Sequence, residues 1–437
     1  MAGYVEDRWY KKGPPDPEDP KQKPTRIETA RHGKGKRYKV AGIPGVRARS
    51  FDRLTGPQGA NAWLAKAQHQ ASSGESIDPR RGEILLADYI EQEWWPSKAY
   101  EDPSTAATVR SRVDTHIVPY LGHLQLNGIK TPQLKRWLAA LKGGTGPGTI
   151  NEAWHYLAAI LQAAVDDERL TKNYCRSQKS VRPPARPAPK PRAWSKETVL
   201  AVQQAIDPRF RIAVDIGVGA GLRAGEVFGL AVEDIDEEGE RIHVRRQIKK
   251  VGSKLCYALP KGQKTRTVPV PAYLLKRIAE HLAERPAQLV KLPWSNPAPG
   301  ETEREKDLRA PREHALILPG ARGGGMRRDA WDTRIWKPAL SAAGVIGPAV
   351  ETKTPIKSRP GKFRTVKAYP ESRENGFHAL RHTFASVQLD AREPIPAVSS
   401  WLGHENPSIT LRIYAHMMPE ADGRGRTAMQ AWFEGSS

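Results

Sequence analysis

The stretch WLGHENPSITLRIYAH, residues 401–416, decides how the C-terminal part of this chain is interpreted. It contains a Leu-Gly-His triplet that ends at His404, with Tyr414 ten positions later and Thr410 one helical turn before the tyrosine. A second Leu-Gly-His triplet at 121–123 has no such tyrosine after it, which indicates a chance match. An isolated tyrosine is far more often a packing residue than a nucleophile, so the interpretation depends on what accompanies Tyr414.

Three stretches upstream carry the residue types that could accompany such a tyrosine: GLRAGEVFGL (221–230), LPKGQKTRTVPV (259–270) and HALRHTFAS (378–386). Attack on a phosphodiester without a metal needs fixed positive charge around the phosphate oxygens. Arginine supplies this charge because its planar guanidinium binds two oxygens and stays protonated. Free tyrosine has a pKa near ~10, so a cationic pocket and a histidine help it to react. The four stretches together therefore suit metal-free transfer of a phosphodiester bond.

In order and content these stretches resemble the catalytic domain of tyrosine recombinases, the phage integrase family. Matched motif by motif, the resemblance implies a catalytic set of six residues: Arg223, Lys261, His378, Arg381, His404 and Tyr414. It implies that the tyrosine attacks a DNA phosphate to give a 3′-phosphotyrosyl link. The lysine would protonate the leaving 5′ oxygen, His378 would act as general acid or base, and the two arginines with His404 would hold the phosphoryl oxygens. No cofactor or metal is implied.

Several of these residues have simpler explanations. Lys264 lies in the same turn as Lys261, and lysines on exposed turns usually only aid solubility; the position relative to the following strand favours Lys261. Glu226 follows Arg223 by three residues and could orient it, or merely pair with it on the surface. His382 is the rival to His378, and we expect it to point elsewhere and to pack behind the site. Glu226 and His382 are therefore supporting residues.

The expected fold is multidomain and mainly α with small β elements. Prolines among charges predict a flexible arm over 1–25, and short strands followed by a helix at about 59–71 predict a small basic β/α unit over 26–75. Helix-period apolar spacing predicts a helical domain over 82–175. A basic, proline-rich linker over 176–195 and an α+β catalytic domain over 196–437 complete the chain.

The resemblance extends to the upstream regions. Residues 82–175 are similar to the helical, SAM-like core-type DNA-binding domain of the family, and residues 26–75 to its arm-type DNA-binding domain, although the latter motifs are less specific. The linker contains no acidic residue, so we expect it to lie along a phosphate backbone, although a solvated linker is the simpler interpretation. The predicted DNA contacts are Arg182, Arg186, Lys190, Arg192, Lys36 and Arg37.

Within the catalytic domain, alternation predicts strands at about 242–248, 255–259 and 266–270, the last two bracketing the turn that carries Lys261. Helices are expected at 196–206 and 210–219. Two polar, basic stretches at about 291–312 and 347–374 are expected to be surface insertions.

Composition supports a polyanionic partner. The chain has 437 residues and a formal net charge of +22, with 70 Lys and Arg against 48 Asp and Glu. Each phosphate that Lys or Arg neutralises releases condensed counterions. No apolar run is long enough to span a bilayer, the N-terminus lacks a secretory core, and two distant cysteines exclude a disulfide framework. We therefore expect a cytoplasmic, nucleoid-associated protein without metal or membrane partners.

The sequence thus predicts a site-specific recombinase that integrates or excises a mobile element. Its expected partners are double-stranded DNA with core-type and arm-type sites, three further copies of itself in a synaptic tetramer, and accessory bending or excision factors. Two alternatives stay open: a type IB topoisomerase-like nicking-closing enzyme, and a non-catalytic DNA-binding regulator with the same fold. An RNA-binding protein would explain only the charge.

Overall fold

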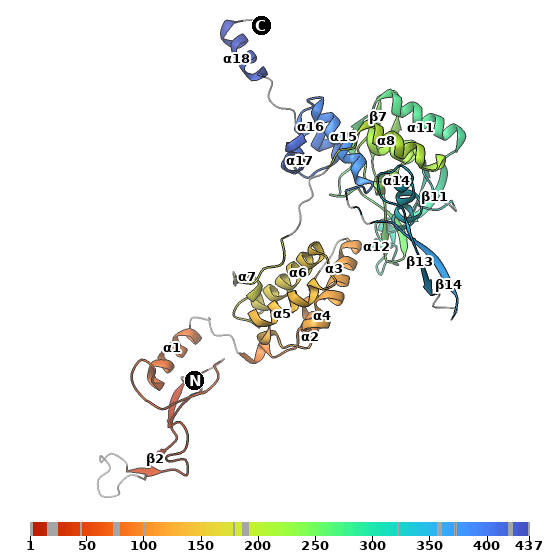
Figure 1. Cartoon of the computed structure of the whole chain (residues 1–437). Coiled ribbons are helices and arrows are strands. Elements are labelled where there is room, and N and C mark those ends of the chain that lie inside the picture. Colours follow the sequence, from red (N-terminus) through yellow and green to blue (C-terminus); the bar gives the residue numbers. More distant parts are fainter. Residues whose placement is uncertain are drawn as a thin grey trace. The chain divides into compact units, whose positions relative to one another are not determined.

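The computed structural model describes residues 3–14, 25–43, 46–72, 79–98, 102–177, 180–185, 192–320, 323–355, 361–370, 372, 374–417 and 423–435. The chain divides into two compact units, residues 1–101 with 105–187 and residues 102–104 with 188–437 (Figure 1). Helices dominate both units and the sheets are small, so the predicted fold class is confirmed.

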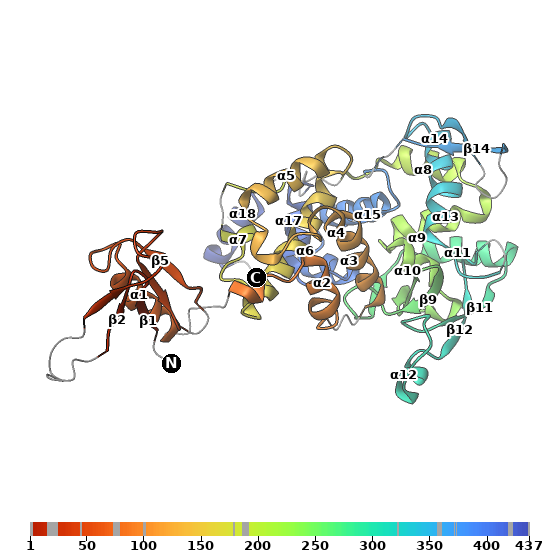
Figure 2. The ribbon, with the colours of Figure 1, turned by 90° about the horizontal axis from the view of Figure 1, so that it is seen from below.

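The first unit begins with a small β/α part (Figure 2). Strands β1 (Tyr4–Asp7), β4 (Tyr38–Ala41) and β5 (Arg49–Phe51) form an antiparallel sheet, and β2 (Tyr10–Lys12) pairs with β3 (Arg26–Glu28). Helix α1 (Ala60–Ser72) contacts β1 and β4. The prediction of a flexible arm over 1–25 is therefore wrong for β1 and β2, because these strands complete the sheets. Residues 15–24 lie outside the described residues.

The rest of the first unit is a helical bundle. Its elements are η1 (Pro79–Gly82), α2 (Leu86–Tyr89), the π-helical turn η2 (Ile90–Trp94), α3 (Pro103–His116), α4 (Val118–Leu121), η3 (Leu126–Gly128), α5 (Thr131–Lys142), α6 (Pro147–Asp166) and α7 (Tyr174–Ser177). Amphipathic spacing brings leucines and tryptophans of these helices into one core, in which the rings of Trp137 and Trp154 stack with centroids 6.2 Å apart. The predicted helical character of this region is confirmed.

The linker prediction needs correction at both ends. Val181 is buried in the core of the helical bundle, and the Asn151 amide donates to the Pro184 carbonyl. At the other end, the Trp194 backbone N–H donates to Thr383 Oγ1 at 2.8 Å, and its ring stacks on Trp336. Residues at both ends of the predicted linker therefore pack against the two units, and residues 186–191 lie outside the described residues.

The second unit is an α+β fold. Its helices are α8 (Lys196–Ala205), η4 (Pro208–Phe210), α9 (Arg211–Gly219), α10 (Ala224–Phe228), η5 (Val232–Asp234), α11 (Ala272–Glu284), α12 (Glu303–Leu308), α13 (Arg328–Trp331), η6 (Asp332–Trp336), α14 (Lys337–Ala342), α15 (His378–Asp390), α16 (Ile395–Leu402), α17 (Pro407–Tyr414), η7 (Ala415–Met417) and α18 (Arg424–Glu434). The apolar helix α9 packs on α15 so closely that a Cβ on Gly217 would lie 2.7 Å from Leu380 Cδ1. This contact brings the segment after α9 next to α15.

The strands of this unit are β6 (Ile235–Asp236), β7 (Arg241–Val244), β8 (Gln247–Val251), β9 (Lys254–Ala258), β10 (Arg266–Pro269), β11 (Gln288–Pro293), β12 (Pro311–Leu316), β13 (Val350–Pro355) and β14 (Phe363–Ala368). Strand β9 pairs with β8, and β10 pairs with β7. Strands β9 and β10 match two of the predicted strands, but the strand predicted at about 242–248 is two strands, β7 and β8, interrupted at Arg245 and Arg246. The predicted pairing of β9 with β10 is also wrong. The segment with Lys261 connects two sheets because the nearer turn, at Gly252, already closes the hairpin with β9.

The two predicted insertions differ in structure. Strands β11 and β12 form a hairpin whose base is anchored by Val290 and Leu316, both buried in the main core. The predicted stretch 291–312 lies between these two residues and contains no buried residue, which agrees with a surface position. Strands β13 and β14 form a second hairpin that stands out from the unit (Figure 1). Most of its described side chains are exposed.

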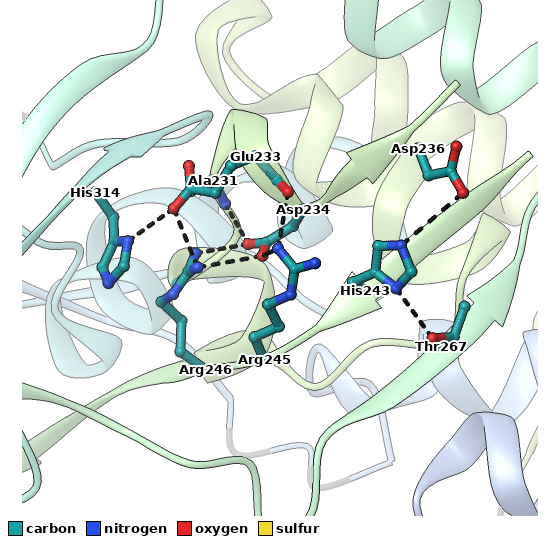
Figure 3. Close-up of polar contacts among 10 residues, drawn as sticks. Ala231, Glu233, Asp234, Asp236, His243, Arg245, Arg246, Thr267 and His314 are labelled. Carbon is teal, nitrogen blue, oxygen red and sulfur yellow. Dashed lines mark hydrogen bonds and ion pairs between the residues drawn. The ribbon is translucent and has the colours of Figure 1, made fainter. Parts of the chain in front are cut away.

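A network of charges fixes the β12 hairpin and the turn η5 (Figure 3). The buried Arg246 guanidinium binds Asp234 at 2.6 Å, and His314 of β12 lies 2.7 Å from Glu233. Asp234 also accepts the Ala231 backbone N–H. These contacts fix the turn η5, which connects α10 to β6.

Candidate active site

A tight turn and a helix start orient Arg223. Gly221 has φ +64°, and a Cβ there would lie 2.5 Å from Phe384 Cδ1, so only glycine fits this turn. Arg223 is the N-cap of α10, and its backbone N–H donates to Glu226 Oε2 at 2.9 Å. Its guanidinium donates to Glu226 Oε1 at 2.9 Å and to the Gly403 carbonyl at 3.4 Å. The sequence left two roles open for Glu226, and its burial favours orientation of the arginine over a surface ion pair.

A third arginine, which the sequence analysis missed, holds Glu226. The Arg266 guanidinium donates to both Glu226 oxygens, at 3.1 and 2.6 Å, and to the Trp401 carbonyl at 2.6 Å. Burial acts to raise the pKa of the fully buried Glu226, but the bonds and charge of Arg266 outweigh it and lower the pKa to about 2. Glu226 is therefore a carboxylate that joins α10, β10 and the end of α16.

Arg381 is the second predicted arginine, and it lies next to Arg223. It is fully buried, and it donates to the carbonyl oxygens of Gly221 (2.9 Å) and Leu402. Its Nε has no hydrogen-bond partner in the described part of the chain. Burial, and then the charge of Arg223, lower the pKa of Arg381 to about 9, so it still carries its charge at neutral pH. The site thus holds two adjacent guanidiniums.

Tyr414 ends α17 and turns its hydroxyl toward the cationic cluster. Only 1 % of the residue is exposed, and its Oη lies 2.8 Å from His382 Nδ1. Burial raises the pKa of Tyr414 to about 12, against the opposing positive charges of Arg381 and Arg223. The expectation that His382 points elsewhere is therefore wrong. Residues 378, 381 and 382 have i, i+3, i+4 spacing, which puts all three on one stripe of α15.

The remaining histidines border the same cluster. His404 follows Gly403, whose left-handed conformation (φ +62°) ends α16, and its Nδ1 lies 2.8 Å from Thr410 Oγ1. His378 begins α15 and meets the His382 ring edge-on, with centroids 4.8 Å apart. Part of His378 reaches solvent, yet loss of hydration on its packed side and the charge of Arg381 lower its pKa.

Lys261 is not tied to the cluster. It is exposed in the segment between β9 and β10, and within the described residues no hydrogen bond or ion pair joins Lys261 or Lys264 to the other site residues. The choice between the two lysines therefore stays a prediction.

The predicted DNA contacts stay predictions. Arg37 donates from Nε and Nη2 to Asp7 at 2.8–3.1 Å and lies over the Tyr10 and Tyr38 rings, so it also stabilises the β/α part. Lys36 is exposed, 3.8 Å from Asp52. Arg182 and Arg192 are exposed. Arg186 and Lys190 lie outside the described residues.

We expect Arg266→Met to destabilise the second unit by about 3–5 kcal/mol, because it leaves the buried Glu226 carboxylate short of its main partner. Urea unfolding of the full chain, followed at the transition of this unit, measures the change. Arg285→Met is the matched control: its partner Glu284 is exposed, so a loss of about 0–1 kcal/mol is expected. Equal effects of the two substitutions would contradict the role of Arg266.

We also expect stability to fall as the pH drops from about 7 to about 4. Burial, with the charge of Arg381 as the next cause for both, lowers the pKa of His382 and of His404 to about 4, while an unfolded histidine titrates near ~6.5. Between these two pH values the unfolded chain binds more protons than the folded chain. The free energy of unfolding therefore falls by on the order of 2 kcal/mol for each histidine. Unfolding midpoints at several pH values test this, and His404→Asn should flatten the profile. A profile unchanged by the substitution would refute the assignment.

The described residues contain no group of three or more His, Cys, Asp or Glu placed to hold a metal ion. None of their helices is long and apolar enough to cross a bilayer.

Comparison with known protein families matches two segments of the chain. Residues 88–142 match the phage integrase N-terminal SAM-like domain, and residues 360–420 match the phage integrase family. A XerC-like tyrosine recombinase of Caldanaerobacter subterraneus is 27% identical over 338 residues, which cover 71% of this chain and 76% of that protein. The integrase of Mycobacterium phage D29 is 28% identical over 273 residues, or 59% of this chain and 70% of that protein.

Solved structures show the same fold. The Tn1549 transposon integrase in complex with transposon right end DNA has a TM-score of 0.55 at 20% identity, covering 80% of this chain and 99% of that one. The lambda integrase dimer bound to a COC′ core site has a TM-score of 0.51 at 12% identity, covering 88% and 94%. At these identities the likeness concerns the fold alone.

Proposed function

The chain belongs to the phage integrase family of tyrosine recombinases and is a site-specific DNA recombinase, and we propose that Tyr414 is its nucleophile. One observation carries this proposal. The Tyr414 hydroxyl, at the end of α17, lies among cationic and imidazole side chains from α10, α15 and the turn after α16. The tyrosine ring is deeply buried, but its hydroxyl contacts polar and charged side chains rather than apolar ones.

Arg223 and Arg381 bind the scissile phosphate in this mechanism. The two guanidiniums donate hydrogen bonds to Glu226 and to backbone carbonyl oxygens, and these bonds hold them in position before DNA binds. The Nε of Arg381 is buried and has no hydrogen-bond partner in the described part of the chain, so its N–H is left for an anionic oxygen once the phosphate enters the site. Charge that then develops on the phosphoryl oxygens meets donors that the protein already holds in position. His404 holds a further phosphoryl oxygen.

The strand is cut by in-line displacement. Oη of Tyr414 bonds to phosphorus, the bond from phosphorus to the 5′ oxygen breaks, and Lys261 supplies the proton that the leaving oxygen needs, with His378 as an additional acid or base. The 3′-phosphotyrosyl ester keeps the bond energy. Attack by the 5′ hydroxyl of a partner strand reverses the steps, so the reaction requires neither ATP nor a metal.

The substrate we propose is duplex DNA with core-type sites bound by residues 82–175 and arm-type sites bound by the β/α part. Strand exchange between two duplexes requires four protomers, and bending or excision factors complete the assembly. The net charge of +22 supports such a substrate. The reaction integrates or excises a mobile element, and it takes place at the nucleoid in the cytoplasm.

A strand-exchange assay tests the function. Core sites are first selected from random duplexes by binding to the protein; a labelled and a longer unlabelled duplex with this site are then mixed with the protein in EDTA without ATP. We expect a labelled product of new length. Relaxation of supercoils without exchange would instead favour the topoisomerase-like alternative, and binding without any cleavage would favour the regulator.

A further inference from the structure

The phenolic oxygen of Tyr414 has one hydrogen-bond partner in the described part of the chain, Nδ1 of His382 at 2.8 Å. The two rings meet edge-on, with centroids 5.6 Å apart. His382 comes from α15 and Tyr414 from α17, so the contact results from packing between helices rather than from sequence proximity. No other histidine of the site touches this oxygen.

The other two histidines are occupied differently. His404 Nδ1 is bonded to Thr410 Oγ1, and His378 meets His382 rather than the tyrosine. Tyr414 must lose its proton when Oη bonds to phosphorus, and an acceptor must lie within about 2.6–3.2 Å to take it. Among the three histidines only His382 satisfies this requirement.

We propose that His382 is the general base of strand cleavage. As the bond from Oη to phosphorus forms and the bond to the 5′ oxygen breaks, the phenolic proton passes to His382 Nδ1; on rejoining, the departing phenoxide takes it back. This assignment rests on the proposed function of Tyr414 and adds a seventh residue to the catalytic set.

The charges around His382 couple this base to the substrate. His382 faces Arg381 and His378 on its own helix and Tyr414 on α17, and His404 lies close enough for their charges to interact. Burial and the charge of Arg381 keep the imidazole neutral in the free protein, ready to accept a proton. A phosphate bound between the guanidiniums offsets their positive charge and makes the imidazolium easier to form. Proton transfer is therefore favoured only when DNA occupies the site.

The test is single-turnover cleavage of a nicked core-site duplex. His382→Asn keeps a side-chain oxygen that accepts the phenol's hydrogen bond but cannot take its proton, so we expect cleavage to slow about 10²–10⁴-fold with DNA binding retained. His281→Asn is the matched control: this buried histidine on α11 contacts the Ile317 carbonyl, and its loss should change the rate less than about threefold.

A more acidic phenol separates proton transfer from a structural effect. With 3,5-difluorotyrosine at position 414, a base is less needed, so His382→Asn should slow cleavage by less than about tenfold. An equal loss with both phenols, or unchanged or faster cleavage by His382→Asn, overturns the proposal. Such a result leaves the nucleophile untouched, whereas covalent complex formation by Tyr414→Phe would remove the proposed function itself.

Discussion

Tyr414→Phe protein should bind a nicked core-site duplex as tightly as the wild-type protein and form no covalent complex with it. The substitution removes one oxygen and leaves the buried ring in place among its neighbours. It also leaves His382 without its phenol partner, so a small loss of stability is expected, about 1–3 kcal/mol. The covalent complex is measured as a slow-migrating band after denaturing electrophoresis.

Tyr257→Phe is the matched control for this experiment. Tyr257 is also fully buried in the second unit, but its hydroxyl donates to the Val290 carbonyl, outside the cationic cluster. Its removal should leave the yield of covalent complex within about twofold of wild-type. A yield from Tyr414→Phe that equals the control would remove the nucleophile assignment.

Arg381→Lys should slow cleavage about 10²–10³-fold, and Arg223→Lys by a similar factor. The Arg381 guanidinium donates to two carbonyl oxygens, and its Nε has no partner among the described residues. The single ammonium group of a lysine cannot reproduce this arrangement of donors. Arg223 likewise donates to Glu226 while facing the site. Single-turnover cleavage at saturating protein isolates the chemical step from binding.

Arg277→Lys provides the comparison for these two substitutions. Arg277 lies on α11 and pairs with Asp215 and Glu280, so its loss should alter cleavage by less than about threefold. Unfolding curves for each variant show whether a slow rate reflects a damaged fold. Normal cleavage by both Arg223→Lys and Arg381→Lys would mean that the phosphate is not held as we describe.

Much of the fold followed from the sequence because periodicity is a local property. The helix-period apolar spacing within 82–175 and the helix expected at 210–219 correspond to helices such as α6 and α9. Strand pairing was harder to predict. Strand β10 pairs with β7, which is not the strand before it in sequence, and alternation of apolar residues does not specify which strands pair. The strand Tyr4–Asp7 was missed because the prolines that follow it dominated the local composition.

Site residues that belong to the family's motifs could be predicted from the sequence. Residues that reach the site only through packing between distant elements could not. Arg223, Arg381, His404 and Tyr414 were selected by their motifs, and the structure brings them together. Arg266 was missed because a strand arginine looks exposed until its partner is known. The one signal in the sequence was Glu226, whose carboxylate, if buried, needs charged or hydrogen-bonding partners, and the structure supplies Arg266 in addition to Arg223.

His382 shows the same limit in another form. Its spacing of four from His378 on a helix was visible in the sequence and already implied a shared face. Which histidine touches the tyrosine depends on how α17 crosses α15, and no local pattern encodes that crossing.

The central claim is tested most directly by locating the DNA-linked residue. Wild-type protein is trapped on a nicked core-site duplex, the DNA is digested to a short nucleotide remnant, and the protein is cleaved with trypsin for mass spectrometry. The account predicts a remnant on Tyr414 in the peptide 413–424, linked through a 3′ phosphate. A remnant on any other residue, such as Tyr369, or a free 3′ phosphate with no linked peptide, would contradict it.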